Sequence, residues 1–377
     1  MILLPSTIHS QMHRLYTYMS DFYFQWQVNK RLIMTTKFFN LSIIYTKLFL
    51  KEKYICFYEN LSRRYYNVLF FGSDLISLKS LQKVNQFRKS ENIIKRLDLV
   101  TANSSKNKTI IEKYAQTENI RLLQWPHLDI KNNEYDIGII VAFGHLIKED
   151  VLKKFPLGMV NVHPSLLPRW RGAAPIIYTL MHGDETAGVS LMKIKPNIFD
   201  VGEIISQQKV LISKDIKLPE LTEQLSDIGA DMLVECLRTL PTCLTKAIPQ
   251  SNEGVTYAKK INKGISEVRW FSMSAKDVYN LYRAIYGLYP LTTKFRDKRI
   301  KLFNAFLVNS DPEYTNKSVG SLEYCENTKA IRILCKDKQF IYFRTLRVLG
   351  KREISALDFY NGYIKNVPLD KRNVVIC

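Results

Sequence analysis

The most informative stretch of the chain is Val160-Asn-Val-His-Pro-Ser-Leu-Leu-Pro-Arg-Trp-Arg-Gly-Ala-Ala-Pro175. Its beginning is predicted to be a β-strand, and the spacing of two places Asn161 and His163 on one face of that strand. Pro164 has no amide hydrogen and ends the strand pairing, so this polar pair should lie at the carboxyl end. Ligands of open α/β sheets bind at that edge. The stretch therefore predicts a functional site there.

Strands and helices alternate on both sides of this stretch. Apolar, β-branched runs predict strands at 67–71, 96–101, 135–142, 158–162, 187–194 and 203–208, with a short extended piece at 122–123. Helical patterns cover 75–87, 109–117, 148–154, 174–182 and 218–240. This alternation predicts an α/β domain built on a mainly parallel, Rossmann-like sheet.

The pattern changes after Pro249. One helix is expected at 275–286, and short apolar runs follow at 300–306, 330–335 and 340–349. These features predict a small, β-rich second domain. The expected organisation is a basic extension at 1–64, a catalytic domain at 65–250 and a basic domain at 255–377.

Charge is distributed unevenly along the chain, whose formal net charge is +20. Residues 67–254 contain 23 basic and 21 acidic residues, whereas residues 255–377 contain 23 basic and 11 acidic residues. A basic domain beside a nearly neutral one favours a polyanionic partner held next to a separate site. Simple solubility is the alternative explanation.

The first 64 residues have the composition of an organelle import sequence, being basic, poor in acids and rich in Ser, Thr and aromatic residues. Lys37 and Lys47 interrupt the longest apolar stretch, so no membrane span is expected. A disordered tail or an incorrectly assigned start are the alternatives. The chain's six cysteines include no C-x-x-C pair, which argues against a disulfide framework or structural zinc and fits a reducing compartment.

Three polar residues suggest acyl-type transfer. Asn161 can donate a hydrogen bond to an oxygen that gains charge, and His163 can move protons near neutral pH. Asp200, in Lys195-Pro-Asn-Ile-Phe-Asp-Val-Gly-Glu203, is expected in a turn between two strands. A carboxylate near His163 would orient the ring or bind a catalytic water. Taken singly, each residue also fits a purely structural role in a loop or turn.

Together these segments resemble the folate-dependent formyltransferases, whose active-site signatures are Asn-x-His-Pro-Ser-Leu-Leu-Pro and a later Asp-x-Gly. The resemblance extends from about residue 67 to the C-terminus. It implies that Asn161, His163 and Asp200 are catalytic and that 10-formyltetrahydrofolate is the formyl donor, with no metal. The donor would be held by two loops, consisting of Phe143, Gly144, His145, Leu146 and Ile147, and of Ser165, Leu166, Leu167 and Pro168.

Three further segments resemble the branch of this family that acts on methionyl-tRNA, namely 169–175, 257–261 and 265–270. This resemblance implies formylation of the α-amino group of methionyl initiator tRNA by a monomer with an OB-like β-barrel as its second domain. With the import-like extension, it implies the mitochondrial matrix. Candidate tRNA contacts are Lys106, Lys108, Arg169, Arg171, Arg269, Lys294, Arg296, Lys298, Arg299 and Lys301.

Two other functions remain open from the sequence. One is formyl transfer to a small amine such as a nucleotide sugar, which would not call for so wide a basic domain. The other is a folate- or RNA-binding homologue without activity, which the three intact catalytic residues disfavour.

Overall fold

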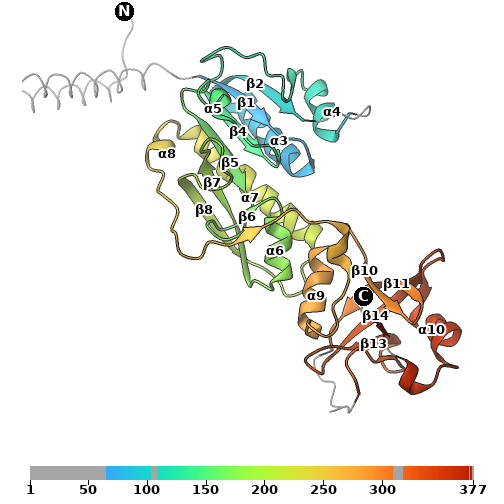
Figure 1. The fold of residues 1–377 in the computed structure, drawn as a ribbon. Coiled ribbons are helices and arrows are strands. Elements are labelled where there is room, and N and C mark those ends of the chain that lie inside the picture. The colour runs from blue at the N-terminus through green and yellow to red at the C-terminus, as the bar shows by residue number, and fades with distance from the viewer. Residues whose placement is uncertain (1–64, 103–107, 309–316, 373, 376–377) are drawn as a thin grey trace, which may run out of the picture. The chain divides into compact units, whose positions relative to one another are not determined.

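The computed structural model describes residues 65–102, 108–308, 317–372 and 374–375, and Tyr65–Cys377 forms one compact unit. The import sequence expected at 1–64 and the RNA contact expected at Lys106 lie outside the described residues. The unit contains two large sheets, one in each half of the chain (Figure 1).

The first sheet has the strand order β3-β2-β1-β4-β5-β7-β8. Its first five strands are parallel, and the last two run antiparallel to their neighbours. The strands are β1 (Tyr66–Phe71), β2 (Ile94–Thr101), β3 (Leu122–Gln124), β4 (Ile137–Val141), β5 (Met159–His163), β7 (Thr186–Lys193) and β8 (Ile204–Leu211). The predicted α/β domain with a mainly parallel sheet is confirmed.

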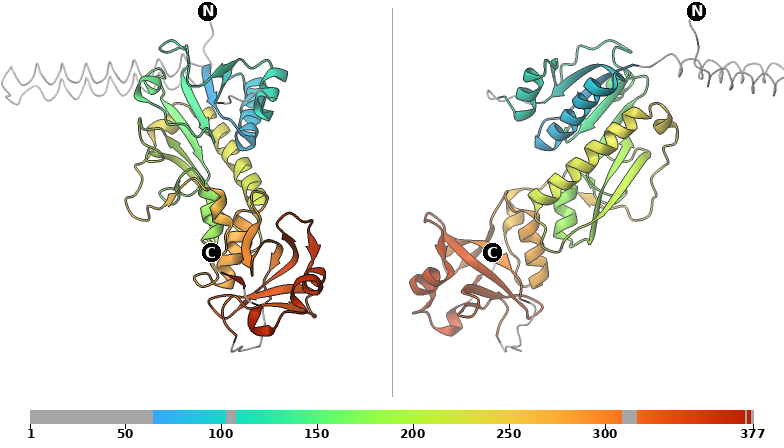
Figure 2. Two further views of the ribbon diagram at one scale, coloured as in Figure 1. Left: turned by 45° about the vertical axis from the view of Figure 1, so that its right-hand side comes forward. Right: turned by 180° about the vertical axis from the view of Figure 1, so that it is seen from behind.

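Both faces of this sheet are covered, which explains why β1 is apolar throughout. Val68 and Phe70 face one core, and Leu69 and Phe71 face another. The first core lies under three helices, of which α3 and α7 lie side by side (Figure 2). These helices are α3 (Leu75–Glu91), α4 (Ile110–Thr117) and α7 (Leu218–Arg238), while α5 (Glu149–Leu152) covers the second core.

Two helix ends differ from the sequence prediction. α3 continues one turn beyond residue 87 to Glu91, and its C-cap residue Asn92 adopts the left-handed conformation with φ 52°. α7 stops at Arg238 rather than at residue 240, because Leu240 precedes Pro241 and that position disfavours helical backbone. The short helix α8 (Thr242–Thr245) follows.

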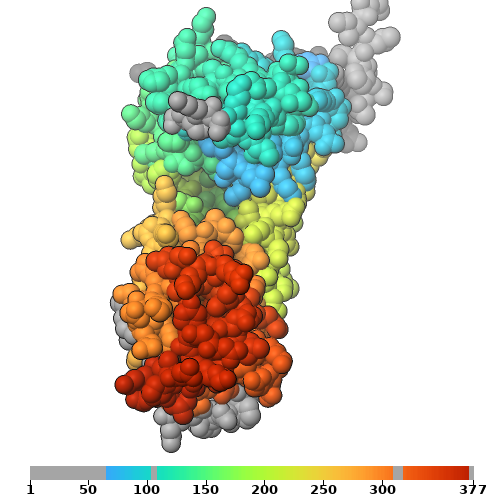
Figure 3. All heavy atoms as spheres, turned by 90° about the vertical axis from the view of Figure 1, so that its right-hand side faces the viewer, coloured from blue at the N-terminus to red at the C-terminus, as the bar shows by residue number. Residues whose placement is uncertain are grey.

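The second sheet is antiparallel, with the order β12-β13-β14-β11-β10-β16 and β15 beside β14. The Leu322 amide on β12 donates to the Arg372 carbonyl beside β16 at 2.8 Å, so the two ends of the sheet meet as expected of an OB-like barrel. Figure 3 shows this region in orange and red. Its strands are β10 (Leu291–Phe295), β11 (Lys298–Phe306), β12 (Leu322–Cys325), β13 (Ala330–Leu334), β14 (Phe340–Val348), β15 (Ile354–Ser355) and β16 (Val374–Val375).

Strand β10 was not predicted from the sequence, although its signal is present. Leu291, Thr293 and Phe295 are buried and alternate with the less buried Thr292 and Lys294, which is the period of a half-buried strand. Helices of this region are η1 (Lys263–Ser266), α9 (Ala275–Ala284), α10 (Ala356–Phe359), η2 (Tyr360–Ile364) and η3 (Leu369–Lys371). None of the helices in the described part of the chain is long and apolar enough to cross a bilayer.

Helix α9 ties the second sheet to the segment that follows the signature stretch. It packs against α6 (Pro175–Met181), and the buried Arg283 side chain donates to the Leu180 carbonyl at 3.2 Å. In addition, β6 (Arg171–Gly172) pairs in parallel with β9 (Tyr257–Ala258). The start of the basic region is therefore hydrogen-bonded directly to the signature stretch.

Candidate active site

The structure brings together the three residues that the sequence proposed as catalytic. β5 presents Asn161 and His163, and the turn between β7 and β8 presents Asp200. One oxygen of Asp200, Oδ1, lies 3.6 Å from His163 Nδ1 and 3.5 Å from the Asn161 amide nitrogen. His163 and Asp200 are only 4% and 7% exposed. A single buried carboxylate oxygen thus connects the other two side chains.

The second nitrogen of His163, Nε2, lies 3.0 Å from the main-chain carbonyl of Trp170. The imidazole ring therefore lies between two hydrogen-bond acceptors, the Trp170 carbonyl and the Asp200 carboxylate.

Trp170 holds its carbonyl in place through an uncommon backbone conformation. Its φ of 62° lies in the left-handed region, which bulky residues seldom adopt. The Trp170 amide donates to the Thr256 hydroxyl, and its indole Nε1 donates to Asp184, both at 2.8 Å. These two contacts, neither expected from the sequence, stabilise the strained residue that faces His163.

Gln250 fastens the Asp200 turn. Its side-chain nitrogen donates to the main-chain carbonyls of Asp200 and Gly202, each at 2.9 Å. Its side-chain oxygen accepts two hydrogen bonds from Arg171, at 2.6 and 3.1 Å. The Gly172 amide completes this anchoring by donating to Asp200 Oδ2 at 2.8 Å. No motif in the sequence singled out Gln250, because it lies in the irregular segment that follows α8.

The signature loop after His163 rests on two polar residues of the neighbouring strands. The Ser190 hydroxyl donates to the Ser165 carbonyl and accepts from the Leu167 amide, at 2.6 and 2.9 Å. The Gln207 side chain donates to both the Leu167 carbonyl and the Ser190 hydroxyl, at 2.9 and 2.8 Å. Ser190 thereby uses its full capacity of one donor and two acceptors.

The remaining loop residues differ in what they expose. The Leu167 side chain is buried against Met192 and Ile204, whereas Leu166 and Pro168 are half-buried. The Ser165 hydroxyl donates to the Arg169 carbonyl at 2.7 Å, so it is occupied within the loop. A ligand would therefore meet the backbone and the outer side chains of this loop.

The loop at 143–147 follows β4, whose last residue Val141 pairs with Val162 of β5. Phe143 and Ile147 bury their side chains in the second core of the sheet, while Leu146 is half-buried. Gly144 and His145 are exposed. The loop thus offers backbone groups and the His145 ring, rather than the side chains of Phe143 and Ile147.

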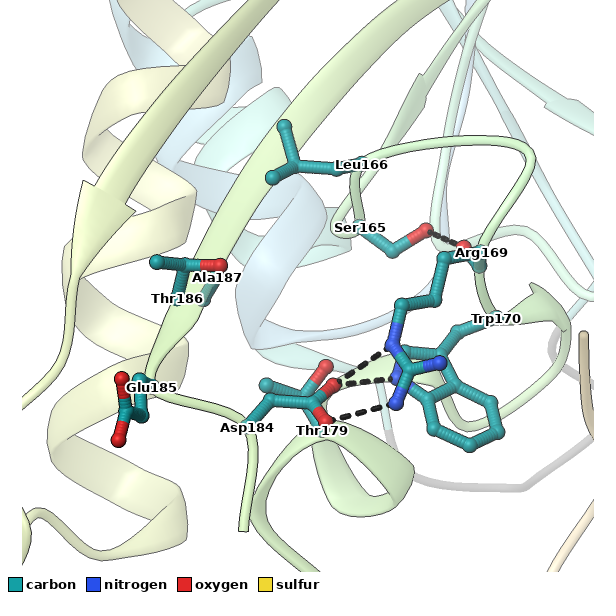
Figure 4. A pocket seen from close by; sticks show the side chains of 9 residues that line it. All are labelled: Ser165, Leu166, Arg169, Trp170, Thr179, Asp184, Glu185, Thr186 and Ala187. Carbon is teal, nitrogen blue, oxygen red and sulfur yellow. Dashed lines mark hydrogen bonds and ion pairs between the residues drawn. The ribbon is translucent and has the colours of Figure 1, made fainter. Parts of the chain in front are cut away.

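A cavity of about 330 Å³ lies beside the signature loop (Figure 4). At its wall, the Arg169 guanidinium makes two hydrogen bonds to Asp184, at 2.7 and 2.9 Å, and lies 4.2 Å from the Trp170 ring centre. Arg169 and Arg171 each have a partner within the chain, so a contact of either with RNA remains a prediction.

Three of the basic residues expected in the second region, Lys294, Arg299 and Lys301, share the less buried face of its sheet, which we call the basic face. Lys294 lies opposite Arg299, and Lys301 lies opposite Arg347. Like charges facing each other across strands destabilise a sheet, and within the chain Glu353 compensates Arg347 at 3.3 Å. Arg269, Arg296, Lys298 and Arg299 are exposed, as is Lys108 in the first half of the chain. Among the described residues, no group of three or more His, Cys, Asp or Glu could hold a metal ion.

Comparisons with known proteins agree with this geometry. Residues 90–237 match the formyl transferase family model, and residues 260–364 match the model of the formyl transferase C-terminal domain. The mitochondrial methionyl-tRNA formyltransferase of Homo sapiens is 38% identical over 79% of this chain and 78% of its own length. The methionyl-tRNA formyltransferase of Fusobacterium nucleatum is 26% identical over 78% of this chain and 96% of its own length.

Solved structures support the fold. A sugar 3N-formyl transferase crystallised in the presence of dTDP and 5-N-formyl-THF has a TM-score of 0.56 at 21% identity, covering 76% of this chain and 99% of its own. An N-formyltransferase from Helicobacter canadensis, in complex with folinic acid and dTDP-3-aminofucose, has a TM-score of 0.55 at 19% identity, covering 74% and 98%. By its relatives and its two matched domains, the chain belongs to the formyl transferase family and, within it, to the methionyl-tRNA formyltransferases.

Proposed function

We propose that this chain transfers the formyl group of 10-formyltetrahydrofolate to the α-amino group of methionyl initiator tRNA, producing N-formylmethionyl-tRNA. The observation that carries the proposal is the Asp200 oxygen shared by Asn161 and His163 at the end of β5. An amide donor, an imidazole and a carboxylate in contact are the groups that acyl transfer to an amine needs.

In the proposed reaction, the neutral amine attacks the formyl carbon, and the formyl oxygen becomes an oxyanion. Asn161 and a protonated His163 stabilise that oxygen. Because His163 Nε2 is hydrogen-bonded to the Trp170 carbonyl, the ring must exchange one of its two contacts to reach the substrate. Collapse of the intermediate breaks the bond to the folate nitrogen, which receives the amine's proton through His163, Asp200 or a water.

A folate-type donor fits the two loops at the carboxyl ends of β4 and β5. We place it along 143–147 and along Ser165, Leu166, Leu167 and Pro168. Exposed backbone of the first loop can hydrogen-bond a pterin ring, and the second loop is held rigid by Ser190 and Gln207. The proposed reaction uses no metal.

We assign the catalytic domain to 65–250 and the tRNA-contacting domain to 255–377. The basic face of the second sheet would bind phosphates, and the pairing of β6 with β9 would keep this domain next to the catalytic residues. Proposed tRNA contacts are Lys106, Lys108, Arg169, Arg171, Arg269, Lys294, Lys298, Arg299 and Lys301. Because the relative from Homo sapiens is a mitochondrial form, we place the chain in mitochondria. We propose the matrix as its compartment and a monomer as its state.

The direct test incubates the purified full chain with 10-formyltetrahydrofolate and methionyl-tRNA, followed by mild deacylation and detection of formylmethionine. We expect a product from methionyl-tRNA and none from free methionine. Formylation of a sugar nucleotide amine but not of methionyl-tRNA would reject the proposal. Folate binding without any formylated product would point to a homologue that lacks activity.

Neutralising the basic face should weaken tRNA binding rather than chemistry. In the triple variant Lys294→Gln, Arg299→Gln, Lys301→Gln, we expect KM for methionyl-tRNA to rise with little change in kcat. The slope of log affinity against log salt should fall by about 0.7–0.9 for each lost phosphate contact. Binding titrations at several salt concentrations measure this slope.

The matched control removes the same charge from exposed lysines of the proposed catalytic domain, in the variant Lys95→Gln, Lys209→Gln, Lys246→Gln. If both triple variants shift tRNA affinity equally, net charge explains the effect and the basic face does not.

Gln250 is expected to act on kcat by positioning Asp200. The variant Gln250→Ala loses the hydrogen bonds to the Asp200 and Gly202 carbonyls and to Arg171. A small displacement of Asp200 should lower kcat by about tenfold to 10²-fold. Exposed Gln208 on β8 provides the control, Gln208→Ala, which should keep full activity. Steady-state kinetics with KM for tRNA unchanged would separate positioning from RNA binding.

A further inference from the structure

Two cysteines meet where α7 ends and α8 begins. The sulfur atoms of Cys236 and Cys243 lie 3.0 Å apart, and neither is in a disulfide. A disulfide bond is about 2.05 Å long, so a displacement of about 1 Å would join them. The sequence showed no motif here, because the two cysteines are 7 residues apart in the chain and do not form a C-x-x-C pair.

The two thiols differ in exposure. Cys236 is 5% exposed and packs into the core beneath α7. Cys243 is half-buried and lines a cavity of about 670 Å³ together with Ile205, Glu235 and Arg238. Cys236 also borders this cavity but is more deeply buried, so a small molecule from solvent reaches Cys243 more readily than Cys236.

The two thiols also differ in pKa, which assigns Cys243 the role of nucleophile and leaves the proton on Cys236. The contact between the two sulfur atoms, in which either can donate, lowers the pKa of the Cys243 thiol, and the Thr239 side chain adds to the effect. The Cys243 thiol can also donate to the Cys236 carbonyl, at 3.2 Å. The same contact, together with burial, raises the pKa of the Cys236 thiol. The thiolate is the reactive form of cysteine.

We propose that Cys243 and Cys236 form a dithiol that a hydroperoxide oxidises reversibly to a disulfide. The Cys243 thiolate attacks one peroxide oxygen, the O–O bond breaks, and the departing oxygen leaves as water or an alcohol after taking up a proton. The sulfenic acid on Cys243 is then attacked by Cys236 sulfur. The S–S bond forms, the S–O bond breaks, and the hydroxyl leaves as water with the Cys236 proton. The two thiols lose two electrons to the peroxide, and an external dithiol restores them.

This site is distinct from the proposed active site and independent of the proposed function. Neither cysteine contacts Asn161, His163 or Asp200 through any hydrogen bond or ion pair observed in the described residues. The proposal is tested by thiol chemistry alone, so its failure would leave the formylation proposal untouched.

The test treats the full chain with a small excess of hydrogen peroxide, blocks remaining thiols with N-ethylmaleimide, and maps tryptic peptides by mass spectrometry. Trypsin cleaves after Arg238, so the peptides of Cys236 and Cys243 stay together only if a disulfide joins them. We expect that linked pair, and its loss after dithiothreitol. At pH 7, without peroxide, Cys243 should alkylate about tenfold faster than half-buried Cys325, which serves as the internal reference.

Single variants separate the two roles. In Cys236→Ser, a sulfenic acid should persist on Cys243 and react with dimedone. In Cys243→Ser, Cys236 should give neither product. The proposal is overturned if Cys243 alkylates no faster than Cys325, or if peroxide links other cysteines in place of this pair. The tryptic peptide map of the protein without substitutions tests the proposal even where a variant fails to fold.

Discussion

Replacing His163 by alanine is expected to lower kcat for formylation of methionyl-tRNA by about 10²–10⁴-fold. The imidazole lies between the Asp200 carboxylate and the Trp170 carbonyl, where it can carry charge and move a proton. Alanine removes both the donor to the oxyanion and the proton carrier. KM for tRNA should change little, because the basic face that binds phosphates is elsewhere. Single-turnover kinetics with saturating donor measure the chemical step directly.

The control for this experiment is His127→Ala, which changes an exposed histidine outside the site and should keep full activity. The single variant Asp200→Asn and the double variant that combines it with His163→Ala extend the test. Groups that act as a unit give strongly non-additive losses, so the double variant should be little worse than His163→Ala alone. A His163→Ala enzyme with unchanged kcat would refute the mechanism, and fully additive losses would refute the coupling through Asp200.

Replacing Gly202 by alanine is expected to lower kcat strongly, although glycine contributes no side chain to the site. A Cβ at Gly202 would lie 1.7 Å from the Lys193 carbonyl oxygen, which belongs to backbone and cannot rotate away. The chain must shift, and Asp200 lies two residues earlier in the same turn. A displacement of about 1 Å costs about 10²-fold in rate, so kcat should fall by that order.

The same clash should reduce the free energy of unfolding by about 1–3 kcal/mol, as overpacking does. Gly362→Ala is the matched control, because a Cβ there meets nothing within 4 Å. Denaturant unfolding and kinetics well below the melting temperature separate instability from misplacement. If Gly202→Ala kept both its kcat and its stability, the short distance to the Lys193 carbonyl oxygen would not explain the glycine of the Asp-x-Gly motif.

The family resemblance that led to the trio was carried by residues close together in the sequence. Asn161 and His163 share a face because strand side chains alternate, and Pro164 marks the strand end because it lacks an amide hydrogen. The apolar runs likewise predicted the parallel strands, since strands buried on both faces need them. Local rules of this kind depend only on spacing and residue type, and the structure agrees with them.

The contacts that complete the site come from residues far apart in the chain. Gln250 reaches the Asp200 turn, Ser190 and Gln207 support the signature loop, and Thr256 fixes Trp170. Each is a polar residue of ordinary type, and nothing in its neighbours along the chain marks it as a partner of the site. The sequence could name Asn161, His163 and Asp200, but only the folded turn between β7 and β8, anchored by Gln250 and Gly172, brings Asp200 to the other two. Side-chain partners are chosen by this three-dimensional packing, because hydrogen bonds depend on distance and direction in space and not on separation along the chain.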